Sequence, residues 1–178
     1  MTQEEAQSLI RSGIAPGAEV WADLGAGTGV FTLALQELLP RGRVYALDKS
    51  PHMLWRLPRR EGVELVVTEG DFTRPFELPE PLDGILMANA LHYAPDPLDA
   101  MGFILPHLKK GGLFILIEYD TDRPNPPWVP YPVSLKRFRA LAEALGLSAP
   151  ELLGRRASVY GSEEIYGVVC KSGLGELS

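Results

Sequence analysis

Three glycines and two aspartates near the N-terminus have the spacing of a nucleoside-binding site. Asp23-Leu24-Gly25-Ala26-Gly27-Thr28-Gly29 follows an apolar run and precedes a segment with helical periodicity. Glycines at this point let the chain turn tightly and let a ligand approach main-chain atoms where a Cβ would clash. Asp48 ends a second apolar run nineteen residues after Gly29, and a carboxylate there accepts hydrogen bonds from ribose hydroxyls. Together the two features predict a nucleoside-containing cofactor.

The elements that must position these residues are short apolar strands that alternate with helices or loops. Such strands pair in parallel with helices on both faces, so we expect a doubly wound α/β fold. Two β runs within 151–171, around Tyr160-Gly161-Ser162, predict an antiparallel hairpin at the sheet edge. The expected strands are 19–24, 43–48, 63–68, 83–88 and 113–118. The expected helices are a short one within 1–14 and longer ones over 28–39 and 134–145. Two more helices are expected, one that starts at Ser50-Pro51 and one that runs from Asp96-Pro97 to Gly111-Gly112.

The composition fits a folded protein and narrows the range of partners. With 178 residues, 46% of them apolar and 22% charged, the chain fits one domain, residues 1–178, without an internal linker. A net charge of −6 argues against a nucleic-acid partner, and one cysteine with three histidines predicts no metal site. The polar N-terminus and the lack of a run of about 18 apolar residues predict a cytoplasmic protein without membrane attachment.

The spacing of the glycines distinguishes between two cofactors. The nicotinamide fingerprint is Gly-x-Gly-x-x-Gly, and here Val30 stands where its third glycine belongs. This difference disfavours a nicotinamide-dependent oxidoreductase. Asp-x-Gly-x-Gly-x-Gly instead resembles the first motif of the class I S-adenosylmethionine-dependent methyltransferases, in particular the small single-domain type 11 or UbiE-like members.

Four further segments extend this resemblance over nearly the whole chain. The closing hairpin is also similar to the family's sixth and seventh strands, of which the last is antiparallel. The resemblance therefore implies a Rossmann-like, seven-stranded sheet that is mostly parallel with an antiparallel last strand. Val44 to Met53 is similar to the family's second strand, and Glu69 to Phe72 is similar to its adenine-binding segment. Ala88 to Tyr93 is similar to the segment beside the methionine part of the cofactor, and Leu108 to Leu113 is similar to the turn into strand five.

The resemblance also implies which residues hold S-adenosylmethionine and its product S-adenosylhomocysteine. Asp48 would bind the ribose hydroxyls, and Asp71 would accept a hydrogen bond from the adenine amino group. Asn89 would present its carbonyl to the ammonium of the cofactor, and Asp23 would orient the glycine loop and attract the same ammonium. Met53 would pack near the adenine, although by itself Met53 is better explained as a core residue, and Asp71 can be a turn residue. The implied cofactor-binding set is Asp23, Gly25, Ala26, Gly27, Gly29, Asp48, Lys49, Met53, Gly70, Asp71, Phe72, Asn89 and Ala90.

The acceptor side of the site is expected after strands four and five. His92 follows strand four, and histidine exchanges protons near neutral pH, so His92 is the first candidate for a catalytic base and Tyr93 the second. The alternative is that His92 only lines the pocket. The proline-rich loop 120–132 is expected to help bind the acceptor, with a plain surface loop as the alternative. The candidate acceptor contacts are Tyr119, Arg123, Trp128 and Tyr131.

One short motif in this loop points to a different substrate class. Asn125-Pro126-Pro127-Trp128 matches the Asn-Pro-Pro-aromatic motif of methyltransferases that act on adenine or glutamine nitrogens. In those enzymes the motif follows strand four, whereas here it follows strand five. We therefore interpret the match as coincidence.

The expected function is transfer of a methyl group from S-adenosylmethionine to a small-molecule acceptor by in-line displacement. That reaction needs alignment from the protein more than chemistry. Two alternatives stay open: a methyltransferase that acts on RNA or protein, and a non-catalytic cofactor-binding subunit that activates a partner methyltransferase. Since only about twelve residues precede the expected core, the proline-rich loop, a homodimer contact or a partner chain would have to close the site.

Overall fold

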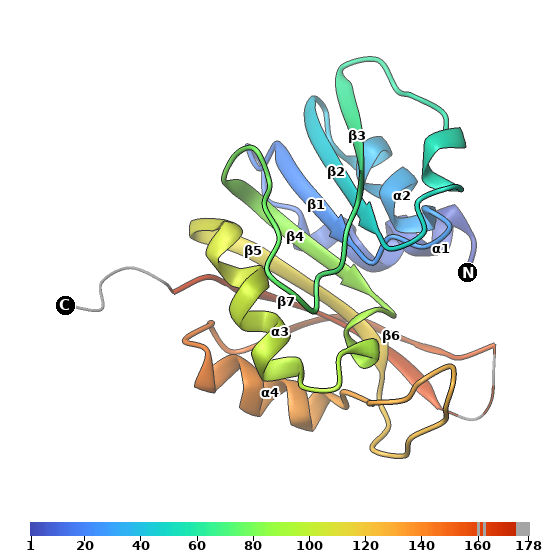
Figure 1. Cartoon of the computed structure of the whole chain (residues 1–178), viewed down its shortest axis with the longest axis vertical. Helices are drawn as coiled ribbons and strands as arrows, with labels where there is room; N and C mark the ends of the chain where they lie inside the picture. Colours follow the sequence, from blue (N-terminus) through green and yellow to red (C-terminus); the bar gives the residue numbers. More distant parts are fainter. Residues whose placement is uncertain (160, 162, 174–178) are drawn as a thin grey trace.

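The computed structural model describes residues 1–159, 161 and 163–173. Its strands are Val20–Leu24 (β1), Gly42–Asp48 (β2), Val63–Glu69 (β3), Leu82–Ala88 (β4), Leu108–Tyr119 (β5), Glu151–Ala157 (β6) and Glu164–Lys171 (β7). They form one sheet in the order β3-β2-β1-β4-β5-β7-β6, in which β1 to β5 are parallel and β7 is antiparallel to both β5 and β6 (Figure 1). This confirms the predicted seven-stranded, Rossmann-like sheet and its terminal hairpin. Tyr160 and Ser162 of the expected hairpin turn lie outside the described residues.

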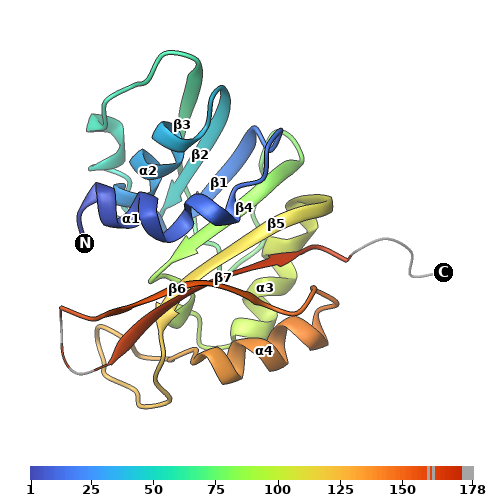
Figure 2. The ribbon, with the colours of Figure 1, turned by 180° about the vertical axis from the view of Figure 1, so that it is seen from behind.

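Helices cover both faces of the sheet, as expected. They are Gln3–Ile10 (α1), Val30–Leu38 (α2), Pro97–Ile104 (α3) and Leu135–Ala144 (α4), with 3-10 turns at Arg11–Gly13 (η1), Leu54–Arg56 (η2), Leu91–Tyr93 (η3) and Leu105–His107 (η4). α1 and α2 pack on one face, and α3 and α4 pack on the other (Figure 1, Figure 2). Because both faces of the central strands are buried, their sequences are nearly continuous apolar runs. None of the helices in the described part of the chain is long and apolar enough to cross a bilayer.

The N-terminal helix begins with the predicted cap. The Thr2 hydroxyl accepts from the Glu5 N–H at 3.2 Å, and the Glu5 carboxylate accepts from the Thr2 N–H at 2.7 Å. The same carboxylate lies 2.9 Å from the guanidinium of Arg156 on β6. The cap therefore also fixes α1 against the far edge of the sheet.

The helix expected at Ser50-Pro51 does not form. The chain makes a turn there and then only the 3-10 segment η2. Asp48 Oδ1 accepts from the Ser50 N–H at 2.9 Å, which holds this segment in a turn. Pro58 follows closely and blocks a longer helix, because proline has no N–H to donate and restricts the residue before it.

The helix expected between Asp96-Pro97 and Gly111-Gly112 starts as predicted but ends early. The Asp96 side chain accepts from the N–H groups of Leu98 and Asp99 at 3.0 and 3.1 Å, which is a regular N-cap. The helix ends at Ile104, because Pro106 cannot donate the next main-chain hydrogen bond. The residues up to the glycine pair therefore belong to η4 and β5 and not to a helix.

Gly84 on β4 has no side chain and so leaves room for the buried indole ring of Trp21. A Cβ added at Gly84 would lie 2.5 Å from the indole ring, and Trp21 is fully buried. We expect Gly84→Ala to lower the free energy of unfolding by about 1–3 kcal/mol, because the ring and the sheet must move apart. Urea denaturation measures this change. Gly102→Ala on α3 is the matched control, because nothing lies within 4 Å of its added Cβ and alanine favours a helix. If both variants unfold at the same urea concentration as wild type, this packing argument is wrong.

Candidate active site

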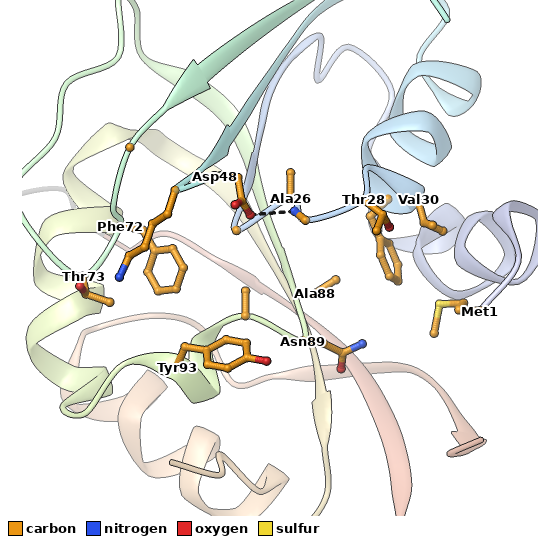
Figure 3. Close-up of a pocket in the computed structure, with 16 residues that line it drawn as sticks. Met1, Ala26, Thr28, Val30, Asp48, Phe72, Thr73, Ala88, Asn89 and Tyr93 are labelled. Carbon is orange, nitrogen blue, oxygen red and sulfur yellow. Dashed lines mark hydrogen bonds between the residues drawn. The ribbon is translucent and has the colours of Figure 1, made fainter. Parts of the chain in front are cut away.

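A cavity of about 700 Å³, called the first cavity here, opens at the carboxyl ends of β1, β2 and β4 (Figure 3). Open α/β sheets bind their ligands at this edge. The cavity walls come from the glycine loop after β1, the end of β2 and the segments that follow β3 and β4. The lining residues are Met1, Gly25, Ala26, Gly27, Thr28, Val30, Phe31, Asp48, Lys49, Gly70, Phe72, Thr73, Ala88, Asn89, Ala90 and Tyr93.

Asp48 and the glycine loop hold each other in place. The N–H groups of Gly25 and Ala26 donate to the Leu47 carbonyl at 2.8 and 3.0 Å. The Gly27 N–H donates to Asp48 Oδ2 at 2.8 Å, which is the dashed line in Figure 3. A carboxylate has about four acceptor positions. Asp48 therefore keeps acceptor capacity toward the cavity, where a ribose diol would bind.

Gly25 packs so tightly that no side chain fits. Its φ is +72°, a left-handed conformation that favours glycine. An added Cβ would lie 2.6 Å from the Ala90 Cβ and 3.1 Å from the Phe72 ring. The glycine therefore lets the loop approach two other residues of the cavity wall, as well as a ligand.

Asn89 combines a strained backbone with an unpaired polar atom. Its φ is +51°, while its N–H donates to the Ile117 carbonyl of β5 at 2.8 Å. Its side-chain oxygen Oδ1 is buried and has no hydrogen-bond partner among the described residues. Such an oxygen costs about 1–3 kcal/mol unless a donor meets it. A ligand ammonium in the first cavity would supply that donor, so this residue fits the cofactor that the resemblance implies.

A second cavity of about 510 Å³ adjoins the first. The two share Asn89 and Tyr93, so a group in one cavity lies next to a group in the other. Three of the four predicted acceptor contacts, Tyr119, Arg123 and Trp128, line the second cavity. The proline-rich loop after β5 thus forms a wall of this cavity together with η3. The lining residues are Asn89, His92, Tyr93, Tyr119, Thr121, Arg123, Asn125, Trp128, Val129 and Glu163.

His92 in the second cavity is bound to a buried carboxylate, that of Glu118 at the end of β5. His92 Nδ1 lies 2.7 Å from Glu118 Oε2, and the His92 backbone N–H donates to Glu118 Oε1 at 3.2 Å. The side chains of His92 and Glu118 are 2% and 0% exposed. An ionised carboxylate only accepts, so it fixes the proton on Nδ1 and leaves a lone pair on Nε2, which points away from Glu118. Glu118 was not among the predicted site residues, although it directly follows the apolar run from Leu113 to Ile117 in β5.

Asp23 lines neither cavity, and its attraction of the cofactor's ammonium stays a prediction. Its side chain is buried, and its Oδ2 accepts from the Thr32 hydroxyl of α2 at 2.7 Å. Burial raises the pKa of Asp23 from 3.8 to about 7, and the negative charge of Asp48 adds to the effect. Asp23 therefore ties β1 to the first turns of α2 and orients the loop between them.

The raised pKa of Asp23 predicts a pH-dependent stability. Between pH 4 and pH 7 the folded protein binds this proton more tightly than the unfolded chain, so stability is full below the unfolded pKa and falls as the pH rises through 7. Relative to Asp23→Asn, wild type should lose up to about 4 kcal/mol of unfolding free energy over this range. Urea denaturation at pH 4 to 8 measures the difference, and Asp122→Asn at an exposed position is the control. A constant difference between wild type and Asp23→Asn would contradict the buried, proton-binding carboxyl.

Gly29 and Met53 line neither cavity, although Gly29 lies between Thr28 and Val30, which line the first one. Gly29, with a φ of +86°, is the N-cap of α2, and an added Cβ would lie 2.5 Å from a Leu57 methyl. Its glycine is needed for packing against the loop after β2. The Met53 side chain is 53% exposed, so Met53 is not a core residue, and its packing near the adenine stays a prediction. The reason for the exposure is the short turn in place of the expected helix, which leaves this side chain in solvent.

Asp71 and Tyr131 are turned to other partners. Asp71 Oδ1 accepts from both the N–H and the hydroxyl of Thr73, at 2.9 and 2.6 Å, and Oδ2 lies 3.0 Å from Lys49 Nζ. This is the turn residue that the sequence left as an alternative. The Tyr131 side chain lines neither cavity, but its N–H donates to the His92 carbonyl at 3.0 Å. Tyr131 thus fixes the proline-rich loop to η3 through its backbone.

Several residues of the cavity walls were not predicted. Most are sequence neighbours of predicted residues and could have been found by extending each motif by two positions. Met1 and Glu163 have no such signal, because Met1 reaches the first cavity from the N-terminus and Glu163 reaches the second from the hairpin. The unpredicted residues are Met1, Thr28, Val30, Phe31, Thr73 and Ala88 in the first cavity and Thr121, Asn125, Val129 and Glu163 in the second.

The sequence and the fold are both similar to those of known methyltransferases. Trans-aconitate 2-methyltransferase of Azoarcus sp. is 30% identical over 136 residues, which cover 76% of this chain and 48% of that protein. Release factor glutamine methyltransferase of Moorella thermoacetica is 36% identical over 133 residues, covering 57% and 46%. This chain spans about half the length of these two relatives. The structure of Burkholderia thailandensis 1,6-didemethyltoxoflavin-N1-methyltransferase superposes with a TM-score of 0.74 at 19% identity, over 96% of this chain and 77% of that one, which supports the fold.

A family model assigns the chain. The model described as a methyltransferase domain matches residues 22–114, from β1 into β5. That range, more than half of the 178 residues, contains the glycine loop, Asp48 and Asn89. It confirms the resemblance that the motifs indicated. The chain therefore belongs to the methyltransferase domain family, the class I S-adenosylmethionine-dependent methyltransferases.

Proposed function

We propose that this protein transfers a methyl group from S-adenosylmethionine to a small-molecule acceptor. The cofactor would occupy the first cavity and the acceptor the second. The observation that carries the proposal is that the two cavities meet at Asn89 and Tyr93, with the His92–Glu118 pair on the acceptor side. A methyl donor and an acceptor must lie in line for displacement, and adjoining cavities allow this.

The residues of the first cavity have defined tasks in this proposal. Asp48 accepts hydrogen bonds from the ribose hydroxyls, and Asn89 Oδ1 accepts from the cofactor's ammonium. Phe72, whose ring points into the cavity in Figure 3, packs against the bound nucleoside. Bound S-adenosylmethionine supplies a methyl group on a positively charged sulfur, which is already electrophilic. The protein therefore has to align the reactants and exclude water.

His92 supplies the base where the acceptor must lose a proton. Glu118 accepts the Nδ1 proton, which leaves the Nε2 lone pair to take the proton of the acceptor's O–H or N–H. As that proton moves to Nε2, the acceptor atom forms its bond to the methyl carbon, and the carbon–sulfur bond breaks to give the neutral thioether. The positive charge thus passes from sulfur to the imidazole ring, where the Glu118 carboxylate stabilises it.

The second cavity favours a small acceptor over a macromolecule. A volume of about 510 Å³ lies in the range of small-molecule sites. The net charge of −6 disfavours RNA. Trans-aconitate 2-methyltransferase acts on a small molecule by its name, whereas release factor glutamine methyltransferase acts on a protein. A non-catalytic subunit would have no use for the buried His92–Glu118 pair, and this pair favours an enzyme.

Ligand binding and methyl transfer together test the proposal. Thermal unfolding with S-adenosylmethionine, S-adenosylhomocysteine and NADH should show stabilisation by the two sulfur ligands alone, about 2.7 kcal/mol at 100 times the dissociation constant. Labelled methyl groups should then appear in small-molecule extracts and not in RNA or protein fractions. Stabilisation by NADH alone would overturn the cofactor, and label in protein or RNA would overturn the acceptor class. Cofactor binding without any transfer would favour the subunit alternative.

A further inference from the structure

We propose, on the basis of the function proposed above, that the acceptor is a hydroxyaromatic acid with a single carboxylate. Three aromatic side chains, Tyr93, Tyr119 and Trp128, line the second cavity. Trp128 and Tyr93 are 67% and 49% exposed, so the walls of this cavity present a large apolar surface to solvent. Aromatic faces of this kind bind a planar ring by stacking.

Arg123 supplies the site for the carboxylate. It lines the second cavity, and its guanidinium makes no hydrogen bond or ion pair with any described residue. The Arg123 N–H donates to the Thr121 hydroxyl at 3.1 Å, which forms a local turn. Arg155, by contrast, already pairs with Asp120 and Glu164 at 2.8 and 3.1 Å. Arg123 is therefore free to form a bidentate pair with a ligand carboxylate.

Glu163 limits the ligand to one negative charge. Glu163 lines the same cavity as Arg123, so among the described lining residues one acidic side chain faces the cavity together with the arginine. A monocarboxylate can pair with Arg123 and keep away from Glu163. A ligand with two or three carboxylates would bring one of them near Glu163, and like charges disfavour binding. This distinguishes a monocarboxylate from a polyacid.

His92 determines which hydroxyl can react. Phenols lose their proton with a pKa near 10, whereas an aliphatic hydroxyl is about as weakly acidic as water, with a pKa near 16. A difference of about six pKa units makes a phenol about 10⁶-fold more acidic than an aliphatic alcohol. A histidine base therefore removes the proton of a phenol far more readily than that of an alcohol. The aromatic ring that the walls would stack is thus also the group that makes the hydroxyl acidic enough.

Calorimetry with matched ligands tests this inference, with S-adenosylhomocysteine saturating. The ligands are 4-hydroxybenzoate, 4-hydroxyphenylacetate and 4-hydroxycinnamate, whose carboxylates lie at three distances from the hydroxyl, each compared with its amide. At least one acid should bind about tenfold or more tighter than its amide in wild type, and the two should bind equally in Arg123→Gln. Arg139→Gln on α4, which lines neither cavity, should keep the wild-type ratio.

Two further ligands separate the contribution of the aromatic ring from that of the number of carboxylates. 4-Hydroxycyclohexanecarboxylate, with the same two groups on a saturated ring, should bind more weakly than 4-hydroxybenzoate, and so should benzene-1,2,4-tricarboxylate. The inference is overturned if no acid binds, if acid and amide bind equally, if Arg123→Gln keeps the preference, or if either of these two ligands binds tighter. A failure of S-adenosylhomocysteine to bind would overturn the proposed function instead, and Arg123-dependent acid binding measured without it would still stand.

Discussion

Replacing His92 with asparagine lowers the rate of methyl transfer about a hundredfold or more, and leaves the affinity for S-adenosylmethionine within a few fold of wild type. A positioned general base contributes roughly 10²- to 10⁴-fold to a rate. His92 lines only the second cavity, so its loss removes the base without touching the cofactor. Steady-state kinetics over pH and calorimetry with S-adenosylhomocysteine measure the two effects.

Glu118→Gln should reduce the rate in the same direction, although Glu118 touches no substrate. Both Glu118 oxygens accept hydrogen bonds from His92, one from Nδ1 and one from the backbone N–H. A glutamine has one acceptor and one donor group, so its NH₂ must face one of these two nitrogens. If the NH₂ donates to Nδ1, the ring proton moves to Nε2 and the base is blocked. Glu118 is thus a positioning residue, and a changed pH–rate profile distinguishes this role from a purely structural one.

Tyr93→Phe is the comparison for both variants. Tyr93 is the other predicted catalytic residue, and it lines both cavities. The phenylalanine keeps the ring and removes only the hydroxyl, so we expect a rate within about tenfold of wild type. Thermal unfolding of each variant checks that the substitutions at the buried His92–Glu118 pair have not destabilised the fold. A large loss with Tyr93→Phe and a small one with His92→Asn would transfer the role of base to Tyr93.

The parts of the site that could be predicted from the sequence are those coded by adjacent residues. The glycine loop follows β1 directly, and Asp48 ends β2, so strand pattern and spacing place both at the same sheet edge. Asn89 follows β4 in the same way. Parallel strands bring their carboxyl ends together, and hence the local pattern was enough to predict the first cavity.

The parts that could not be predicted depend on contacts between distant residues. His92 and Glu118 are 26 positions apart, and only the register of β4 against β5, with Ala88 beside Ile117, brings them together. Asp71 has a local alternative partner in Thr73, which a family motif does not reveal. The length of a helix also depends on where the next proline falls. These are competitions between local and distant partners, and a periodic pattern does not decide them.

Asp48→Asn should weaken binding of S-adenosylhomocysteine about tenfold to a hundredfold, since hydrogen bonds to a charged acceptor are the stronger ones. Asp71→Asn should change the affinity by about threefold or less, because its carboxylate faces Thr73 and Lys49 at a partly exposed site and lines neither cavity. The two variants make the same chemical change at the two acidic residues that the family resemblance implies for the nucleoside. Calorimetry with each variant measures the difference.

An S-adenosylhomocysteine analogue without the 2′- and 3′-hydroxyls identifies what Asp48 binds. The analogue should lose affinity for wild type and lose little more in Asp48→Asn, because the same hydrogen bonds are then removed twice. Asp48 also accepts from the Gly27 and Ser50 N–H groups, so a collapse of the loop is the competing explanation. In that case the variant would weaken both ligands equally, and its thermal stability without ligand would fall. An equal loss of affinity in Asp71→Asn would show instead that its carboxylate turns from Thr73 to the adenine when the cofactor binds.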